Sequence, residues 1–135
     1  MKRLIALVLF IMLAAAAKAQ TKDTLKTSSD TTIYRSVDQV AEFPGGRAAL
    51  HTYLRDSIKY AAGDTTVGSV AVMFVVEKDG SLTNFNIKRS LNQADDAEAI
   101  RVLSTCPKWT PAVNNGYIVR MSMVYVISFD PVDKK

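Results

Sequence analysis

The architecture of this chain follows from residues 67–90, which read VGSVAVMFVVEKDGSLTNFNIKRS. In the first half, Val67–Glu77, apolar residues occupy both alternating sets of positions, so both faces of a strand there would be apolar. A strand of this kind belongs in the middle of a sheet. Lys78–Ser81, which reads KDGS, contains an Asp-Gly pair, a strong signal of a β-hairpin. We therefore expect Leu82–Ser90 to return as the antiparallel partner strand.

A third strand is predicted over Tyr117–Phe129, where every second residue is large and apolar. A helical segment separates it from the hairpin, and a strand–helix–strand crossover makes the two strands that it joins parallel. The third strand is then antiparallel to Val67–Glu77 and can pair with its free edge. The pattern predicts an α+β fold: a three-stranded antiparallel sheet in the order 2-1-3, with helices packed on one face.

Two helices are predicted from apolar residues at helical spacing. The first follows the turn Phe43–Gly46. Its apolar face comprises Leu50, Tyr53, Leu54 and Ile58, and its polar face comprises Arg47, His51 and Arg55. The second is predicted to begin at Asp95, with Glu98 completing a capping box, and to end at Pro107. Its apolar face would comprise Ala97, Ile100, Leu103 and Cys106.

An export signal is predicted at the N-terminus. Lys2 and Arg3 precede the apolar run Leu4–Ala17, and Ala17-Lys18-Ala19 fits a signal peptidase. These 14 apolar residues are too few to cross a bilayer, which takes about 20, so an inner-membrane anchor is the less favoured alternative. We expect a signal peptide over residues 1–19, cleaved after Ala19, a flexible polar lead-in over residues 20–32, one domain over residues 33–130 and a polar tail over residues 131–135.

Composition argues against several classes of function. Apolar residues make up 48% of the 135 residues and charged residues 22%, as in ordinary globular domains. The 17 basic and 13 acidic residues give a net charge of +4, but removal of the signal would leave 14 against 13. No basic stripe then remains for nucleic acid or a membrane surface. The sequence contains no phosphate loop and no dinucleotide-binding motif, so we expect neither a cofactor nor a small-molecule substrate.

Residues with catalytic or metal-binding chemistry are assigned structural roles. His51, the only histidine, lies six residues from Ser57, so the two side chains point to different sides of a regular helix. The acidic residues in Asp95–Glu98 suit the first turn of a helix better than a metal site. Cys106, the single cysteine, is expected to be a buried structural thiol. Because no nucleophile–base pair can be assembled, we predict that the protein is not an enzyme.

Trp109 lies between Pro107 and Pro111, which hold the crossover passage extended. An exposed tryptophan there would be a candidate contact for a partner protein. The alternative, which we favour, is that the large ring docks over the core and fixes the crossover.

Several of these segments together resemble the TonB C-terminal domain family. They are Gly68–Gly80, Ile87–Ser90, Asp96–Ala99, Lys108–Ala112 and Asn115-Gly116, in this order along the chain. That family has a G-x-V-x-V-x-F-x-V-x-x-D-G hairpin, a helix opening with L-D-x-x-A, a W-x-P-[AG] passage and a glycine before the last strand. The segment that begins at Phe43–Gly46 is similar to the version of this domain with an extra N-terminal helix.

The resemblance implies a periplasmic protein-binding module. Its partner would be a TonB-box-like segment of an outer-membrane receptor, or another envelope protein, which adds as a strand beside the last β-strand. Matched by position, the partner-binding residues are Tyr117, Val119, Arg120, Met121, Ser122, Met123, Val124, Tyr125, Val126, Ser57, Lys59 and Tyr60. A lead-in of 13 residues reaches at most about 45 Å, so we expect binding rather than force transmission across the periplasm.

The last strand is predicted to remain an exposed edge. Tyr117–Phe129 contains no proline and a single charge, Arg120, so little protects its unpaired backbone groups. We expect an extended partner segment to pair along Arg120–Val126. One alternative is that Ile33–Val40 folds back and pairs with this edge itself. Another is a structural domain that forms homodimers through the same edge.

Overall fold

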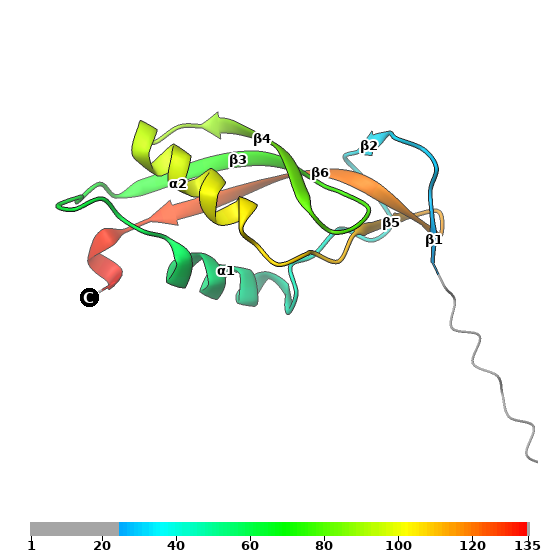
Figure 1. Cartoon of the computed structure of the whole chain (residues 1–135), viewed down its shortest axis with the longest axis horizontal. Coiled ribbons are helices and arrows are strands. Elements are labelled where there is room, and N and C mark those ends of the chain that lie inside the picture. Colours follow the sequence, from blue (N-terminus) through cyan, green and yellow to red (C-terminus); the bar gives the residue numbers. More distant parts are fainter. Residues whose placement is uncertain (1–24, 135) are drawn as a thin grey trace, which may run out of the picture.

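The computed structural model of the chain describes residues 25–134, so the predicted signal peptide lies outside the described residues (Figure 1). Within this range the strands are β1 Lys26–Thr27, β2 Ile33–Tyr34, β3 Gly68–Val76, β4 Leu82–Arg89, β5 Ala112–Asn114 and β6 Tyr117–Phe129. The helices are α1 Gly46–Ser57 and α2 Gln93–Ser104, and a 3-10 helix, η1, follows over Pro131–Lys134. No helix among these residues is both long and apolar enough to span a membrane.

The three predicted strands form the centre of the sheet in the predicted order, β4-β3-β6. β3 pairs antiparallel with both neighbours, and its register with β6 runs from Gly68 opposite Phe129 to Val76 opposite Met121. The prediction of a purely antiparallel sheet of three strands is wrong, because β1, β2 and β5 also pair with β6. The sheet is six-stranded and mixed, since β1 and β2 run parallel to β6.

The additional strands pair with the part of β6 that extends beyond β3. β6 has 13 residues and β3 has nine, so the backbone groups of Tyr117–Arg120 need other partners. β5 pairs with Tyr117–Val119, β1 pairs with the first two of these residues, and β2 pairs with Arg120 and Met121. Strands of two or three residues are too short to show an alternating pattern in the sequence.

Both helices cover one face of the sheet, as predicted (Figure 1). The core on this face joins Val70, Val72, Phe74 and Val76 of β3 to Leu50 and Leu54 of α1 and to Ala99, Val102 and Leu103 of α2. On the opposite face, Val124 and Val126 of β6 are 56% and 50% exposed. Neither α1 nor α2 lies on that face. The domain is therefore a two-layer α+β sandwich with one open face.

α1 begins after two glycines with positive φ angles. Gly45, the N-cap residue, has φ 87° and Gly46 has φ 85°, a conformation that L side chains rarely adopt. Leu50 and Leu54 are buried in the core, and the polar face with its two arginines and His51 is exposed, as predicted. The amphipathic pattern thus correctly predicted both the position of this helix and the face that it buries.

α2 begins two residues before the predicted position, and the assignment of Asp95 as its N-cap is wrong. The N-cap is Asn92: its side-chain oxygen accepts a 2.8 Å hydrogen bond from Asp95 N, and its Nδ2 donates to Asp95 Oδ2 at 2.7 Å. The helix is also rotated relative to the predicted face, because Ala99 and Val102 are buried whereas Ala97 is exposed. The earlier cap leaves Asp95 buried in the first turn.

Trp109 docks over the core, as predicted. It is 4% exposed, and its ring packs edge-on against Phe74 and Phe43, with centroid distances of 5.5 and 5.9 Å. Its backbone amide donates a 2.8 Å hydrogen bond to the carbonyl oxygen of Gly80, in the turn between β3 and β4. Trp109 therefore joins the central strand, the hairpin turn and the segment before α1.

Residues 26–34, which comprise β1, β2 and the chain between them, form an N-terminal strap that lies against the end of the sheet. Lys78 Nζ donates to the carbonyl oxygen of Ser28, and the Arg120 guanidinium donates to the carbonyl oxygen of Thr31 at 2.9 Å. The sequence predicts a polar lead-in up to residue 32, whereas the structure pairs the chain with β6 from Lys26 onward. This pairing depends on long-range contacts that the polar composition of the segment does not indicate.

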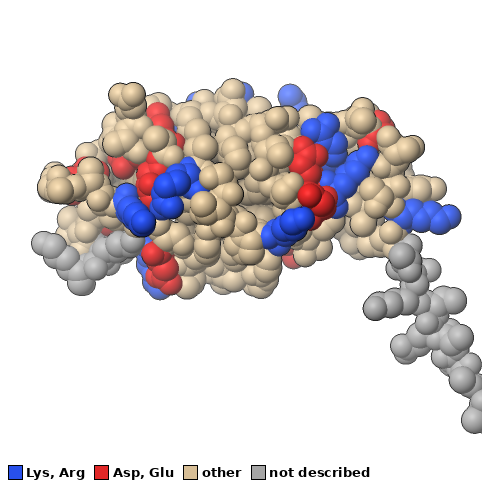
Figure 2. Space-filling model, viewed as in Figure 1, with Lys and Arg blue, Asp and Glu red and all other residues tan. Residues whose placement is uncertain are grey.

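Charged side chains of both signs are mixed on the face seen in Figure 2. Lys and Arg side chains lie next to Asp and Glu side chains in two groups, with a broad uncharged stretch between them. Arg101 with Glu98, and Lys108 with Asp79, are ion pairs of the described residues. This face therefore presents no extended region of one sign.

Candidate protein-binding site at the edge of the last strand

β6 has an unpaired edge over its C-terminal part. One edge pairs with β3 over residues 121–129. Met121 pairs with Tyr34 of β2 as well as with Val76 of β3, so β2 lies on the opposite, outer edge. From Ser122 to Phe129, no strand of residues 25–134 pairs with this outer edge. Backbone N–H and C=O groups of every second residue therefore point outward, where another strand can reach them.

The predicted binding residues of β6 fall into two groups. Those already paired with β1, β2 or β5 are Tyr117, Val119, Arg120 and Met121. Those on the unpaired part of the outer edge are Ser122, Met123, Val124, Tyr125 and Val126. Pairing of Ile33–Val40 with this edge, the alternative stated above, is found only at Ile33–Tyr34. The candidate edge is thus Ser122–Phe129, displaced toward the C-terminus from the predicted Arg120–Val126.

α1 lies beside this edge and runs alongside β6 in the same direction (Figure 1). Two pockets of about 170 and 130 Å³ lie between the two elements and share Tyr125. Together they are termed the edge groove. β6 contributes Met123–Ser128 to its lining, α1 contributes Arg47, Leu50, His51, Leu54 and Arg55, and the C-cap residue Ile58 follows them. A strand added to β6 would therefore have α1 on one side of it.

Tyr60, one of the residues implied by the resemblance, lies at the C-terminal end of the edge groove. Its ring packs edge-on against Phe129 with a centroid distance of 6.2 Å, and its hydroxyl oxygen accepts a 3.0 Å hydrogen bond from Asp130 N. These contacts hold the segment after α1 against the end of β6. The structure thus brings Tyr60 to the candidate edge.

Ser57 and Lys59 form hydrogen bonds with α2 instead. The carbonyl oxygen of Ser57 accepts a 2.9 Å hydrogen bond from Arg101, and the amide of Lys59 donates one of 2.8 Å to Glu98. Arg101 also donates to the Glu98 carboxylate, and these hydrogen bonds lower the pKa of Glu98. These contacts join the C-terminal end of α1 to α2.

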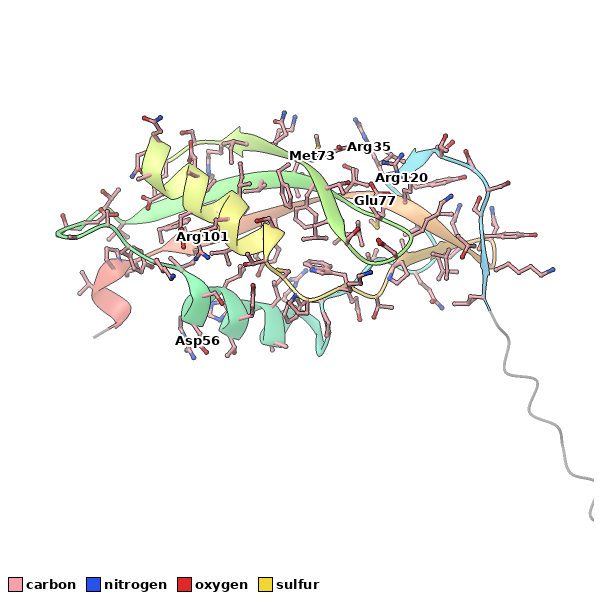
Figure 3. All side chains as sticks on the ribbon, viewed as in Figure 1. Arg35, Asp56, Met73, Glu77, Arg101 and Arg120 are labelled. Atoms are coloured by element: carbon pink, nitrogen blue, oxygen red, sulfur yellow. The ribbon has the colours of Figure 1, made fainter. Side chains whose placement is uncertain are left out.

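Arg120, the single charged residue of β6, already has a partner within the chain. Its guanidinium donates to the Glu77 carboxylate at 2.7 and 2.9 Å, and both side chains are 23% exposed (Figure 3). Hydrogen bonding to Arg120 lowers the pKa of Glu77, and the Thr83 hydroxyl donates to the same carboxylate at 2.6 Å. Arg120 therefore connects the strap to the end of β3.

Arg47, His51 and Arg55 are the residues of the edge groove that the sequence did not indicate. The helical pattern places them correctly on an exposed face, which is the ordinary position of charged residues. Nothing in that pattern shows that β6, some 70 residues later in the chain, lies beside this face. Their position beside the candidate edge depends on this tertiary contact.

Cys106, predicted to be buried, is only partly buried, and it is expected to react slowly with thiol reagents. Burial raises the pKa of its thiol from 9.0 to about 11, so the thiolate fraction at pH 8 falls about 100-fold. Alkylation by iodoacetamide at pH 8 should be about 100-fold slower in the native chain than in the chain unfolded by guanidinium. Equal rates in the two states, measured by mass spectrometry, would contradict this structural role for the thiol.

The fold and the edge define a class of small α+β domain in which one edge of the last strand is unpaired and lies beside a helix. Over residues 59–131 the chain matches the family model of the Gram-negative bacterial TonB protein C-terminal. The chain therefore belongs to this family, as the resemblance predicted. It is a family of non-enzymatic protein-interaction domains of the bacterial envelope. No curated protein matches the chain. The family match begins after α1, so α1 and the strap lie outside it.

Proposed function

We propose that the chain is a periplasmic protein-binding module, in which an extended segment of an envelope partner adds as a strand to the outer edge of β6. The observation that carries this proposal is the unpaired outer edge of Ser122–Phe129, which lies beside α1 and the edge groove. Membership of the TonB C-terminal family supports an outer-membrane receptor as the partner, and a role in TonB-dependent transport. The signal peptide predicted over residues 1–19 supports a periplasmic location.

Strand addition at this position uses two kinds of contact. Main-chain hydrogen bonds to the edge supply affinity, whatever the sequence of the added segment. Its side chains alternate, so one set would enter the edge groove beside α1 and the other would lie beside Val124 and Val126 on the open face. β2 ends at the register of Met121, so the added strand would begin where β2 leaves the outer edge.

Two N-methylated peptides test this proposal. A TonB-box peptide methylated at odd-numbered amides and one methylated at even-numbered amides carry the same number of methyl groups but lose hydrogen-bond donors on opposite edges. Strand addition uses one edge of the peptide, so one of the two should lose binding at least 10-fold while the other binds like the parent peptide. In NMR titrations, the shifts caused by the parent peptide should concentrate in Ser122–Phe129.

Equal binding of both methylated peptides, or shifts that leave Ser122–Phe129 unchanged, would contradict strand addition. The alternative function, a domain that dimerises through the same edge, is favoured by the exposure of Val124 and Val126 next to it. A tight dimer in light scattering that excludes the peptide would support this alternative. A monomer that binds the peptide supports the proposal.

A further inference from the structure

We propose that α1 selects the segment that the edge receives, through Arg47, His51 and Arg55. The preferred segment would be an extended chain with carboxylate side chains at alternate positions and apolar side chains between them. This inference rests on the proposed strand addition and goes beyond it, because it assigns the chemistry of the partner. It also assigns a role to α1, which lies outside the family match.

The two flanks of α1 have different neighbours. On one flank, the Tyr53 hydroxyl donates a 3.3 Å hydrogen bond to the carbonyl oxygen of Val102, so this flank faces α2. On the other flank, Arg47, His51 and Arg55 are exposed and line the edge groove. The basic flank of α1 is therefore the one turned toward the unpaired edge of β6.

The spacing of the three side chains matches that of an added strand. Residues four apart in a helix are separated by a rise of about 6 Å along its axis. Alternate residues of a strand, which share one face, are about 6.6–6.8 Å apart. Because α1 runs alongside β6, three alternate residues of an added strand would each lie opposite one of the three helix residues (Figure 1).

The charges of the two arginines and the ring nitrogens of His51 are available to a partner. Among residues 25–134, no ion pair involves Arg47 or His51. Arg55 lies 3.5 Å from Asp56, but the two side chains are 60% and 65% exposed, and exposed pairs of this kind contribute little. Figure 3 shows Asp56 on the side of α1 turned away from the sheet. A carboxylate in the groove can therefore compete for Arg55.

Acidic residues limit where the partner's carboxylates fit. Glu42 lines the groove near Arg47, and Asp130 lines its other end beyond Arg55. Carboxylates are thus favoured opposite the three helix residues and disfavoured beyond them, toward Glu42 and Asp130. The intervening residues of the strand would lie beside Val124 and Val126 on the open face, which favours apolar side chains.

Two peptides of nine residues test the inference on the full chain. One carries Glu at positions 3, 5 and 7 among Val and Thr residues, and the other carries Gln at the same three positions. In calorimetry at low salt, the Glu peptide should bind about 10-fold more tightly than the Gln peptide. This preference should shrink as salt is raised, because the groove is open to solvent.

Matched charge variants locate the preference on α1. Arg47→Gln/Arg55→Gln should remove most of the preference for Glu and leave binding of the Gln peptide unchanged. Lys88→Gln/Lys108→Gln changes the net charge equally at two exposed positions that do not line the groove, and should keep the preference. If both peptides bind equally, or if the α1 variant keeps the preference, this inference is wrong while strand addition stands. If neither peptide binds, both proposals are contradicted.

Discussion

Trp109→Ala is expected to lower the free energy of unfolding by about 3–5 kcal/mol, the usual cost of removing a buried tryptophan. The indole is almost completely buried and packs edge-on against Phe74 and Phe43. Its loss leaves a cavity between the central strand and the segment that leads into α1. The neighbouring chain is held by backbone hydrogen bonds and cannot collapse fully into this space.

Urea unfolding followed by circular dichroism measures this loss, since the variant has no tryptophan left to report by fluorescence. Lys108→Ala is a matched control, because the adjacent Lys108 is exposed and its ion pair with Asp79 is 3.5 Å long and exposed as well. This control should change stability by less than about 0.5 kcal/mol. Equal stability of Trp109→Ala and the parent chain would show that the ring is not part of the core.

Gly80→Ala is expected to lower the free energy of unfolding by about 3 kcal/mol, through two separate effects. Gly80 has a φ of +87°, which is strained for any residue with a Cβ atom. In addition, a Cβ atom at Gly80 would lie 2.0 Å from the carbonyl oxygen of Trp109. That oxygen belongs to the backbone, so no side-chain rotation can relieve the clash.

Gly63→Ala separates the two effects. Gly63 has a φ of +75°, but nothing lies within 4 Å of a Cβ atom at this position. Alanine there should cost only the conformational strain, about 1–2 kcal/mol. Denaturant unfolding of both variants gives the difference. Equal losses at the two glycines would contradict the close contact between the hairpin turn and Trp109.

The centre of the fold could be predicted because its sequence signals are local. Alternation over β3, an Asp-Gly turn and alternation over β6 each lie within one element, and the crossover rule orders them. α1 was predicted correctly for the same reason. The rotated face of α2 shows the limit: Ala97 and Val102 are both small and apolar, and only contact with β3 and β4 buries one of them and exposes the other.

The rest of the sheet and most of the site depend on contacts between distant residues. The strands β1 and β2 have two residues each and pair with β6 some 90 residues later, so no local sequence pattern predicts them. The free edge was predicted, but its position was not, because the length of β6 covered by these short strands is a tertiary property. The basic flank of α1 was predicted as an exposed face, without its neighbour.

The register of β3 with β6 also has a consequence for how the chain acquires its structure during synthesis. Gly68 pairs with Phe129 and Val76 with Met121. The second edge of β3 therefore stays unpaired until β6 has been synthesised. The β3–β4 hairpin can form early, but pairings of such long sequence separation are slow to form. Until residues 121–129 have emerged, β3 exposes an unpaired edge in a strand that is apolar on both faces, and such edges promote aggregation. A chain shortened by its last 15 residues would therefore remain at this stage.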